Sequence, residues 1–454
     1  FSSRAAVRAP ETRLGVGGST LPAAVCYLCG DVPPCGCPPR LPRFMSLYRK
    51  LDPTDTPGGE AARWLRAGLG GAPLPPLLVV VGLCDGALLG ALASSDVRVL
   101  ALEPDPAMHA RCVSQPLVAQ WITRGHLLYL TGPDFGGADR AWRVFPPRAE
   151  AYKVLTHPRL ETRHEQVVRA AQVLKTILFG VRANEDARRK FAPRFLQNVL
   201  RNAASIAQGA DLRALTDAFA HRPAIVIAAG PSLDRAIESL RSGAYKGLLI
   251  AVDTALRPLL HAGIHPHLVV GADPGAANAR HFHDLPDCSG TWLVAESGLD
   301  PDAVGVFEGR TFWFRISRHH PWPWLNACGV EAAHIEMWGS VLTAAFQVAH
   351  LVGANPIAFA GADLAFTNRR PYARGTTYEF DWAEHVAQGL DLASVWESRL
   401  MARPGIDAID VHGRPTPTTA SLVAFRDWLV TRIGESGRRV LNASGAGILH
   451  GGNI

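Results

Sequence analysis

The distribution of apolar residues predicts a chain of alternating strands and helices. Short, continuous apolar runs rich in Val, Leu and Ile recur along the chain, a pattern typical of parallel strands that are buried on both faces. Most of these runs end near Gly, Ser or Asp and lead into a segment with helical spacing. Predicted strands lie at residues 77–81, 97–102, 126–130, 224–228, 248–252, 268–272, 291–295, 311–314 and 356–360. We therefore expect an α/β fold with parallel sheets.

Breaks in this pattern divide the chain into four parts. Residues 1–44 precede the first regular elements. Residues 45–163 are expected to form a Rossmann-like N-terminal unit. Residues 164–390 are expected to form a doubly wound α/β domain preceded by helices, and residues 391–454 a helical appendage at the carboxyl end.

The first part, residues 1–44, is rich in Pro and shows no sustained apolar period, so we expect a disordered extension. It also holds a C-x-x-C pair and a C-x-C pair, formed by Cys26, Cys29, Cys35 and Cys37. Four thiolates at this spacing are the ligand set of a zinc knuckle, which is the alternative interpretation. The remaining cysteines stand singly in apolar or helical surroundings, as expected of a protein in a reducing compartment.

Composition narrows the possible classes of protein. Of 454 residues, 48% are hydrophobic and 19% are charged, which excludes an intrinsically disordered chain and a basic tail that coats nucleic acid. The formal net charge of +6 modestly favours acidic ligands such as phosphates. The best candidate for a membrane span, residues 74–93, is interrupted by Asp85 and several Gly. We expect a cytoplasmic protein with no membrane span and no nucleic-acid partner.

A glycine turn in the N-terminal unit offers one candidate site. The turn runs from Gly82 to Gly86, and the following strand ends in Glu103. An acidic residue about 20 positions after such a turn binds ribose in dinucleotide and S-adenosylmethionine folds. The turn is G-x-x-x-G rather than G-x-G-x-x-G, so an S-adenosylmethionine site is the weakest hypothesis.

The most informative turn is formed by Gly230, Pro231 and Ser232, which join a buried strand to a helix. Gly allows close approach of a ligand, Pro stiffens the turn, and Ser232 is placed to cap the helix. The N–H groups and the dipole at such a helix start favour phosphate or carboxylate. The turn is therefore predicted to hold an anion.

Polar side chains follow the ends of the other strands of this part of the chain. They include Asp253, Thr254, Asp273 and Asp363. The carboxyl ends of parallel strands meet at one edge of a sheet, where ligands bind in open α/β folds. Gly339 and Ser340 precede a further apolar helix and are expected to form a second anion-holding turn. The sequence predicts one ligand site built from these separate segments.

Six separated motifs between residues 190 and 390 carry a resemblance to known proteins. They are GPSLD (230–234), AVDTALRPLL with AGI-P (251–266), DP (273–274), GSV (339–341), NPI-F-GADLAFT (355–367) and YARG (372–375). In this order they resemble the domain shared by the motility accessory factor (Maf) glycosyltransferases and the archaeal 6-hydroxymethylpterin diphosphokinase MptE-like proteins. The N-terminal unit and the carboxyl end, with residues 419–428 and 442–447, look like the corresponding parts of the Maf group.

The resemblance to the Maf group implies a fold like that of the family 42 sialyltransferases, which use a CMP-activated nonulosonic acid. It implies transfer of pseudaminic or legionaminic acid to Ser or Thr of flagellin. The turns that contain Ser232 and Ser340 would stabilise the departing nucleotide phosphate, and Asp253 and Asp273 would bind hydroxyls or orient the donor. No metal or other cofactor is expected to be required, because the nucleotide monophosphate leaves with little charge to neutralise.

Such a transfer needs a base for the acceptor hydroxyl. His319 and His320 are candidates because His titrates near neutrality, although a His pair in a Trp-rich loop more often has a structural role. Asp363 is the rival base or a metal ligand, and Asp253 is the other catalytic candidate.

Two other functions stay open. An MptE-like diphosphokinase would transfer diphosphate from ATP to a hydroxymethylpterin, with Asp253, Asp273 and Asp363 as Mg²⁺ ligands. The N-terminal unit and the carboxyl end argue against it, because they make the chain much larger than the catalytic unit needs. A non-catalytic protein would use the same sheet edge to bind a nucleotide, a glycan or flagellin.

Overall fold

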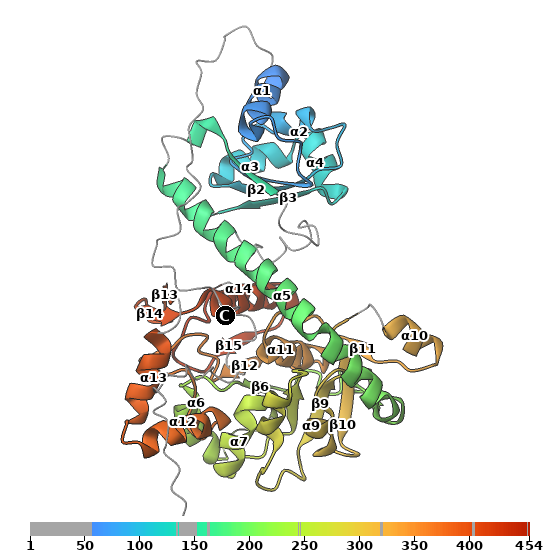
Figure 1. Cartoon of the computed structure of the whole chain (residues 1–454), viewed down its shortest axis with the longest axis vertical. Helices are drawn as coiled ribbons and strands as arrows, with labels where there is room; N and C mark the ends of the chain where they lie inside the picture. The colour runs from blue at the N-terminus through green and yellow to red at the C-terminus, as the bar shows by residue number, and fades with distance from the viewer. Residues whose placement is uncertain are drawn as a thin grey trace, which may run out of the picture.

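The computed structural model describes residues 57–132, 135, 152–160, 164–243, 245, 247–317, 321–401, 405–451 and 453–454. The long helix α5 (His164–Gln208) runs from a small α/β unit across a larger α/β domain (Figure 1). The sheets of both parts consist of parallel strands, so the predicted α/β class with parallel sheets is confirmed.

The small unit contains one parallel sheet with the strand order β3-β2-β1-β4. Its strands are β1 (Leu77–Val81), β2 (Arg98–Glu103), β3 (Leu127–Thr131) and β4 (Tyr152–Thr156). Its helices are α1 (Pro57–Leu69), α2 (Ala87–Ala91), α3 (Pro106–Val113) and α4 (Pro116–Thr123). Alternate residues of β1 face opposite sides. Leu78 and Val80 pack with residues of these four helices, whereas Leu77 and Val79 pack with residues of α5.

Helix α5 belongs to the cores of both parts. Near its start, Ala170 and Leu174 are buried against the sheet of the small unit. Near its end, Val199 and Ile206 are buried in the larger domain. Its 45 residues therefore connect two separate cores with one continuous element.

The length of α5 does not make it a membrane helix, because its sequence contains many charged residues. Within the part of the chain that the structure describes, no helix is both long enough and apolar enough to cross a membrane.

The larger domain is built on a parallel sheet with the order β11-β10-β9-β8-β7-β6-β12-β15, and β5 pairs with β10 beside it. The strands are β5 (Ala210–Asp211), β6 (Ala224–Ile227), β7 (Leu248–Val252), β8 (Leu268–Gly271), β9 (Trp292–Glu296), β10 (Thr311–Arg315), β11 (Ala333–His334), β12 (Ile357–Ala360) and β15 (Val440–Asn442). A separate antiparallel hairpin consists of β13 (Ile406–Ile409) and β14 (Pro415–Thr418). All six strands predicted for this domain are present.

The order of the strands reverses beside β6. From β6 to β11 the chain adds strands in one direction, and it then returns to place β12 on the other side of β6. The helices are α6 (Leu233–Arg241), α7 (Asp253–His261), α8 (Ala276–Ala279), α9 (Pro301–Gly305), α10 (Trp322–Ala327), α11 (Val341–Leu351), α12 (Thr377–Ala387), α13 (Leu392–Met401) and α14 (Ala420–Ser436). Such a reversal leaves a crevice at the carboxyl ends of the strands.

Two cores lie on opposite faces of this sheet. Leu268 and Val270 of β8 pack in a core that also includes residues of α11 and α14. Val269, between them in the sequence, packs in a core with residues of α5, α7 and α9. The continuous apolar runs of the sequence therefore arise because both faces of the strands are covered.

The carboxyl end corrects one expectation. We expected residues 391–454 to form a helical appendage, but β15 is a strand of the main sheet and pairs with β12. Helix α14 buries Trp428, Leu429 and Ile433 in the core beneath that sheet. The sequence pattern did not reveal β15 because the strand is three residues long, too short for a period to be recognised.

We predict that Trp428→Ala destabilises the larger domain strongly, because Trp428 is 2% exposed within its core. Removal of a buried Trp side chain typically costs about 3–5 kcal/mol. The measurement is the midpoint of urea unfolding. The control is Trp324→Ala, since Trp324 is 55% exposed and its loss should leave the midpoint nearly unchanged. Equal midpoints for the two variants would contradict the integration of α14 into the domain.

Candidate functional site

A cavity of about 280 Å³ lies at the carboxyl ends of β6, β7, β8 and β12, where the strand order reverses. Seven residues predicted from the sequence line it together: Gly230, Asp253, Thr254, Asp273, Gly339, Ser340 and Asp363. The starts of α7, α11 and α14 also contribute to the wall. The shared sheet edge thus brings together segments that are more than 180 residues apart in sequence.

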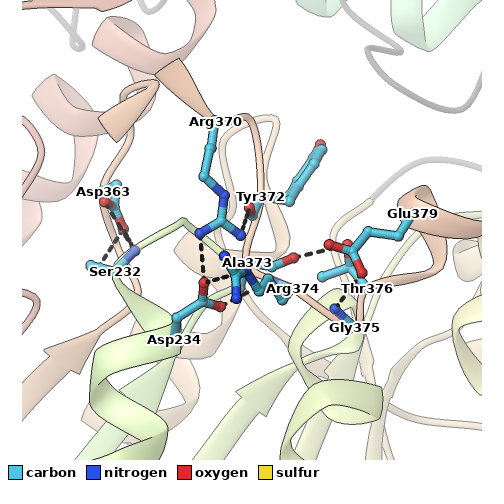
Figure 2. Close-up of polar contacts among 10 residues, drawn as sticks. All are labelled: Ser232, Asp234, Asp363, Arg370, Tyr372, Ala373, Arg374, Gly375, Thr376 and Glu379. Carbon is cyan, nitrogen blue, oxygen red and sulfur yellow. Dashed lines mark hydrogen bonds and ion pairs between the residues drawn. The ribbon is translucent and has the colours of Figure 1, made fainter. Parts of the chain in front are cut away.

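Ser232 has a different role from the predicted one. It occupies the position before α6, but its hydroxyl makes no capping bond to the helix. Instead, the hydroxyl donates to Oδ1 of Asp363 at 2.5 Å, and the Ser232 backbone N–H lies 3.2 Å from the same oxygen (Figure 2). The anion held at the start of α6 is therefore a carboxylate of the protein itself. This correction could not come from the local sequence, because 131 residues separate the partners.

Three glycines make room for Asp363. A Cβ atom at Gly230 would collide with the Asp363 carboxylate, and one at Gly447 would collide with the Asp363 backbone. Gly361 has φ +67° and lies against the carbonyl oxygen of Ala228, a conformation and an approach that favour Gly. Pro231 does not line the cavity; it is part of the turn that precedes α6.

The carboxyl-terminal segment supports the same turn from behind. The Ser444 hydroxyl accepts the N–H of Ala362 at 3.0 Å, and the N–H of Ile448 donates to the carbonyl oxygen of Asp363 at 2.8 Å. The guanidinium of Arg235, on α6, donates to the carbonyl oxygen of Ser444 at 2.5 Å. Residues outside the six motifs therefore fix the geometry of the cavity.

Asp234 joins the first of the six motifs to the last. Its Oδ1 accepts the Arg374 N–H at 2.9 Å, and its Oδ2 accepts a bond from the Arg370 guanidinium at 2.6 Å (Figure 2). Both Arg370 and Arg374 belong to the loop before α12. At the end of this loop, the Gly375 N–H donates to Glu379 at 2.9 Å. This loop carries Tyr372 into the cavity wall.

Asp253 and Asp273 supply the acidic side of the cavity. Burial raises the pKa of Asp253 to about 6, although Thr254 donates to its Oδ1 through both N–H and hydroxyl. Burial also raises the pKa of Asp273 to about 7, and the nearby Asp253 carboxylate adds to the rise. Two carboxyl groups that titrate near neutrality can accept or release protons at physiological pH.

Sequence reasoning missed an aromatic and imidazole wall. His281 lines the cavity, is 2% exposed, and has Nδ1 2.6 Å from the Thr377 hydroxyl. Burial lowers the pKa of His281 to about 3, so its ring is neutral near pH 7. Tyr372 and Tyr378 stack beside it with ring centroids 4.3 Å apart. The only available signal was the position of His281 shortly after the strand that ends in Asp273.

Glu103, the predicted ribose ligand, does not line this cavity. Glu103 is buried in the N-terminal unit and accepts the N–H of Cys84 at 3.1 Å. Its carboxylate thus closes the glycine turn rather than standing free for a ribose. His319 and His320, like residues 1–44 with their cysteine pairs, lie outside the described residues.

Two buried asparagines of α5 position the loops at this edge. The Asn198 side chain donates to the carbonyl oxygens of Pro274 and Gly298, each at 3.0 Å. The Asn202 side chain donates to the carbonyl oxygens of Ser297 and Leu299 at 3.0 and 2.9 Å. Through these two side chains, the end of α5 fixes the segments that follow β8 and β9.

A crevice at the strand reversal of a parallel α/β sheet, with convergent polar groups, is the usual position of the ligand site in an open α/β fold. Residues 197–369 match the family model described as 6-hydroxymethylpterin diphosphokinase MptE-like. The resemblance to MptE-like proteins is thereby confirmed for this part of the chain.

A structure comparison found similarity to a Maf glycosyltransferase from Magnetospirillum magneticum AMB-1. The identity is 18% and the TM-score 0.47, over 87% of this chain and 61% of that chain. The chain thus spans less than two thirds of the length of that protein. A search of curated protein sequences returned no match.

We predict that Gly230→Ala destabilises the fold by about 1–3 kcal/mol, because the added Cβ displaces the Asp363 carboxylate. The measurement is the free energy of unfolding from urea titration. Gly305→Ala is the control, since a Cβ there meets open space. A Gly230→Ala variant as stable as Gly305→Ala would show that the carboxylate is not held as described.

We also predict a pH-dependent effect of Asp273→Asn. Because the folded pKa of Asp273 is about 7 and the unfolded value is about 4, the folded protein keeps a proton that the unfolded chain has released, and stability falls as pH rises between these values. The Asn side chain does not titrate, so the variant does not lose stability in this way as the pH rises. Its melting temperature should therefore exceed that of wild type by roughly 2–4 °C more at pH 8 than at pH 4.

The control for this effect is Asp287→Asn. The exposed Asp287 accepts the Ser289 N–H, which lowers its pKa, so its replacement should cost stability at pH 8. Equal changes in melting temperature at both pH values for Asp273→Asn would refute the raised pKa.

Proposed function

We propose that the chain is a glycosyltransferase that uses a nucleotide-activated sugar. More closely, we propose that it transfers a nonulosonic, sialic-acid-like sugar from a CMP-linked donor to Ser or Thr of flagellin or another protein, in the cytoplasm. The observation that carries this proposal is the two-sided cavity: Asp253 and Asp273 lie in one part of its wall and the start of α11 in another. Carboxyl groups suit sugar hydroxyls, and a helix start suits phosphate.

In this reaction the acceptor oxygen forms a bond to the anomeric carbon while the bond from that carbon to the CMP phosphate oxygen breaks. CMP leaves with the electron pair, and the acceptor proton passes to a base. The start of α11, with Gly339 and Ser340, stabilises the charge that develops on the phosphate. Asp253 and Asp273 are the candidate bases because their pKa values, about 6 and 7, lie near neutrality.

Asp363, which we also considered as a base, is assigned a positioning role instead. Its carboxylate is 1% exposed and is engaged by the amide and hydroxyl of Ser232. His319 and His320 remain candidate bases on sequence grounds.

The family match to residues 197–369 favours a diphosphokinase as the second candidate. That reaction would use Asp253, Asp273 and Asp363 as Mg²⁺ ligands. The geometry does not fit this ligand set, because the Asp363 carboxylate is already engaged by Ser232. Among the described residues, no three His, Cys, Asp or Glu side chains are grouped as a metal site.

We predict that CMP raises the melting temperature of the full chain, whereas ATP with Mg²⁺ does not. Asp253→Asn should weaken CMP binding about tenfold, because a neutral amide oxygen accepts a weaker hydrogen bond from the ligand than a carboxylate does. The measurements are thermal unfolding and calorimetric titration, followed by detection of CMP release and a mass increase of a flagellin substrate.

Asp302→Asn is the matched control. Asp302 is likewise in the first turn of a helix that follows a strand of the same sheet, but it is exposed and lies outside the cavity. Stabilisation by ATP with Mg²⁺ but not by CMP would replace the transferase with the diphosphokinase. Binding of CMP without any transfer would favour a non-catalytic nucleotide-binding protein.

A further inference from the structure

Helix α14 begins at the wall of the cavity, although it lies outside the region of the family match. Its cap, Thr419, accepts the Leu422 N–H with its hydroxyl oxygen at 3.3 Å. The amides of Ala420 and Ser421, at the first two positions of the helix, have no acceptor within the helix. Thr419 and Ser421 both line the cavity. The start of α14 therefore presents donors at the ligand cavity.

Ser421 has a buried hydroxyl group that lacks a partner. The residue is 3% exposed, and within the described part of the chain its Oγ makes no hydrogen bond. A buried polar group without a partner costs about 1–3 kcal/mol, so native structures rarely keep one without a reason. A ligand atom in the adjoining cavity would provide the missing partner.

The charges around the cavity favour an anion at this position. Of the longer helices that start at or beside the cavity, α6 is compensated by Asp363, α7 begins with Asp253, and α12 has Glu379 in its first turn. In contrast, α11 and α14 have no acidic residue in the first turn. Since none of the described residues that line the cavity is Lys or Arg, the starts of α11 and α14 are the positive helix ends there that no acidic side chain offsets.

We propose that the start of α14 is a second anion subsite, in which Ser421 donates a hydrogen bond to an oxygen of a ligand phosphate or carboxylate. The inference rests on the cavity being the ligand site of the proposed function. With α11 binding one oxyanion and α14 another, the cavity selects a donor that carries two anionic groups, such as a phosphate and a sugar carboxylate. Neutral sugars on a nucleotide would leave this subsite unfilled.

The test is a calorimetric titration of the full chain with CMP, cytidine, N-acetylneuraminate and ATP. Ser421→Ala should raise the dissociation constant of an anionic probe about tenfold, because a hydrogen bond to a charged group is lost. Ser421→Asp should abolish measurable binding of that probe by repulsion. The Asp variant should stay folded, because a carboxylate in the first turn suits the helix dipole.

Ser436→Ala is the matched control. Ser436 belongs to the same helix, but it lies at the opposite end and makes local bonds to Ile433 and Arg438. It should bind all probes as wild type does. Cytidine, which carries no anion, should bind wild type and Ser421→Ala equally.

The outcomes separate the subsite from the proposed function. If the Ser421 variants lose affinity for CMP alone, the subsite binds phosphate. If they lose affinity for N-acetylneuraminate alone, it binds carboxylate. Either result supports the subsite. Wild-type affinity in both Ser421 variants would overturn the subsite and leave the transferase standing. Binding of ATP alone, dependent on Ser421, would keep the subsite and overturn the CMP-dependent transferase. Failure of every anionic probe to bind wild type would overturn the subsite.

Discussion

The hydrogen bonds between Ser232 and the carboxylate of Asp363 are the constraint on which the site depends. A buried carboxylate without donors would cost several kcal/mol, and burial raises the pKa of Asp363 above its usual range while the bonds from Ser232 oppose that rise. The partners follow β6 and β12, the neighbouring strands at which the sheet reverses. Their contact therefore fixes the turn that forms the floor of the cavity.

The other motifs are arranged around this contact. Gly230, Gly361 and Gly447 permit the close packing of three backbone segments. Asp234, which follows the first of these turns, accepts the Arg374 N–H and so fixes the loop that contains Tyr372. The residues of the six motifs thus mostly bond to or pack against one another. The polar groups that face the cavity lie at the starts of α11 and α14 and at the two acidic strand ends, Asp253 and Asp273.

Sequence reasoning located the site because it depends on a local rule: polar residues at the ends of buried parallel strands share one edge. Asp253, Asp273 and Asp363 were found in this way. It could not find the bond from Ser232 to Asp363, since nothing in either segment specifies a partner 131 residues away. For the same reason it missed the anchoring of Asn198 on distant carbonyl groups, and Ser421, whose role depends on where α14 begins.

Helix α5 is long enough for a small rotation at one end to produce a large displacement at the other. From Ala170, in the first core, to Asn198, at the cavity edge, the helix rises about 42 Å at 1.5 Å per residue. A tilt of about 5° at the first end would displace the second by roughly 3–4 Å, a distance comparable to a hydrogen bond. Because the Asn198 side chain donates to the carbonyl oxygen of Pro274, such a tilt would also move the loop that carries Asp273.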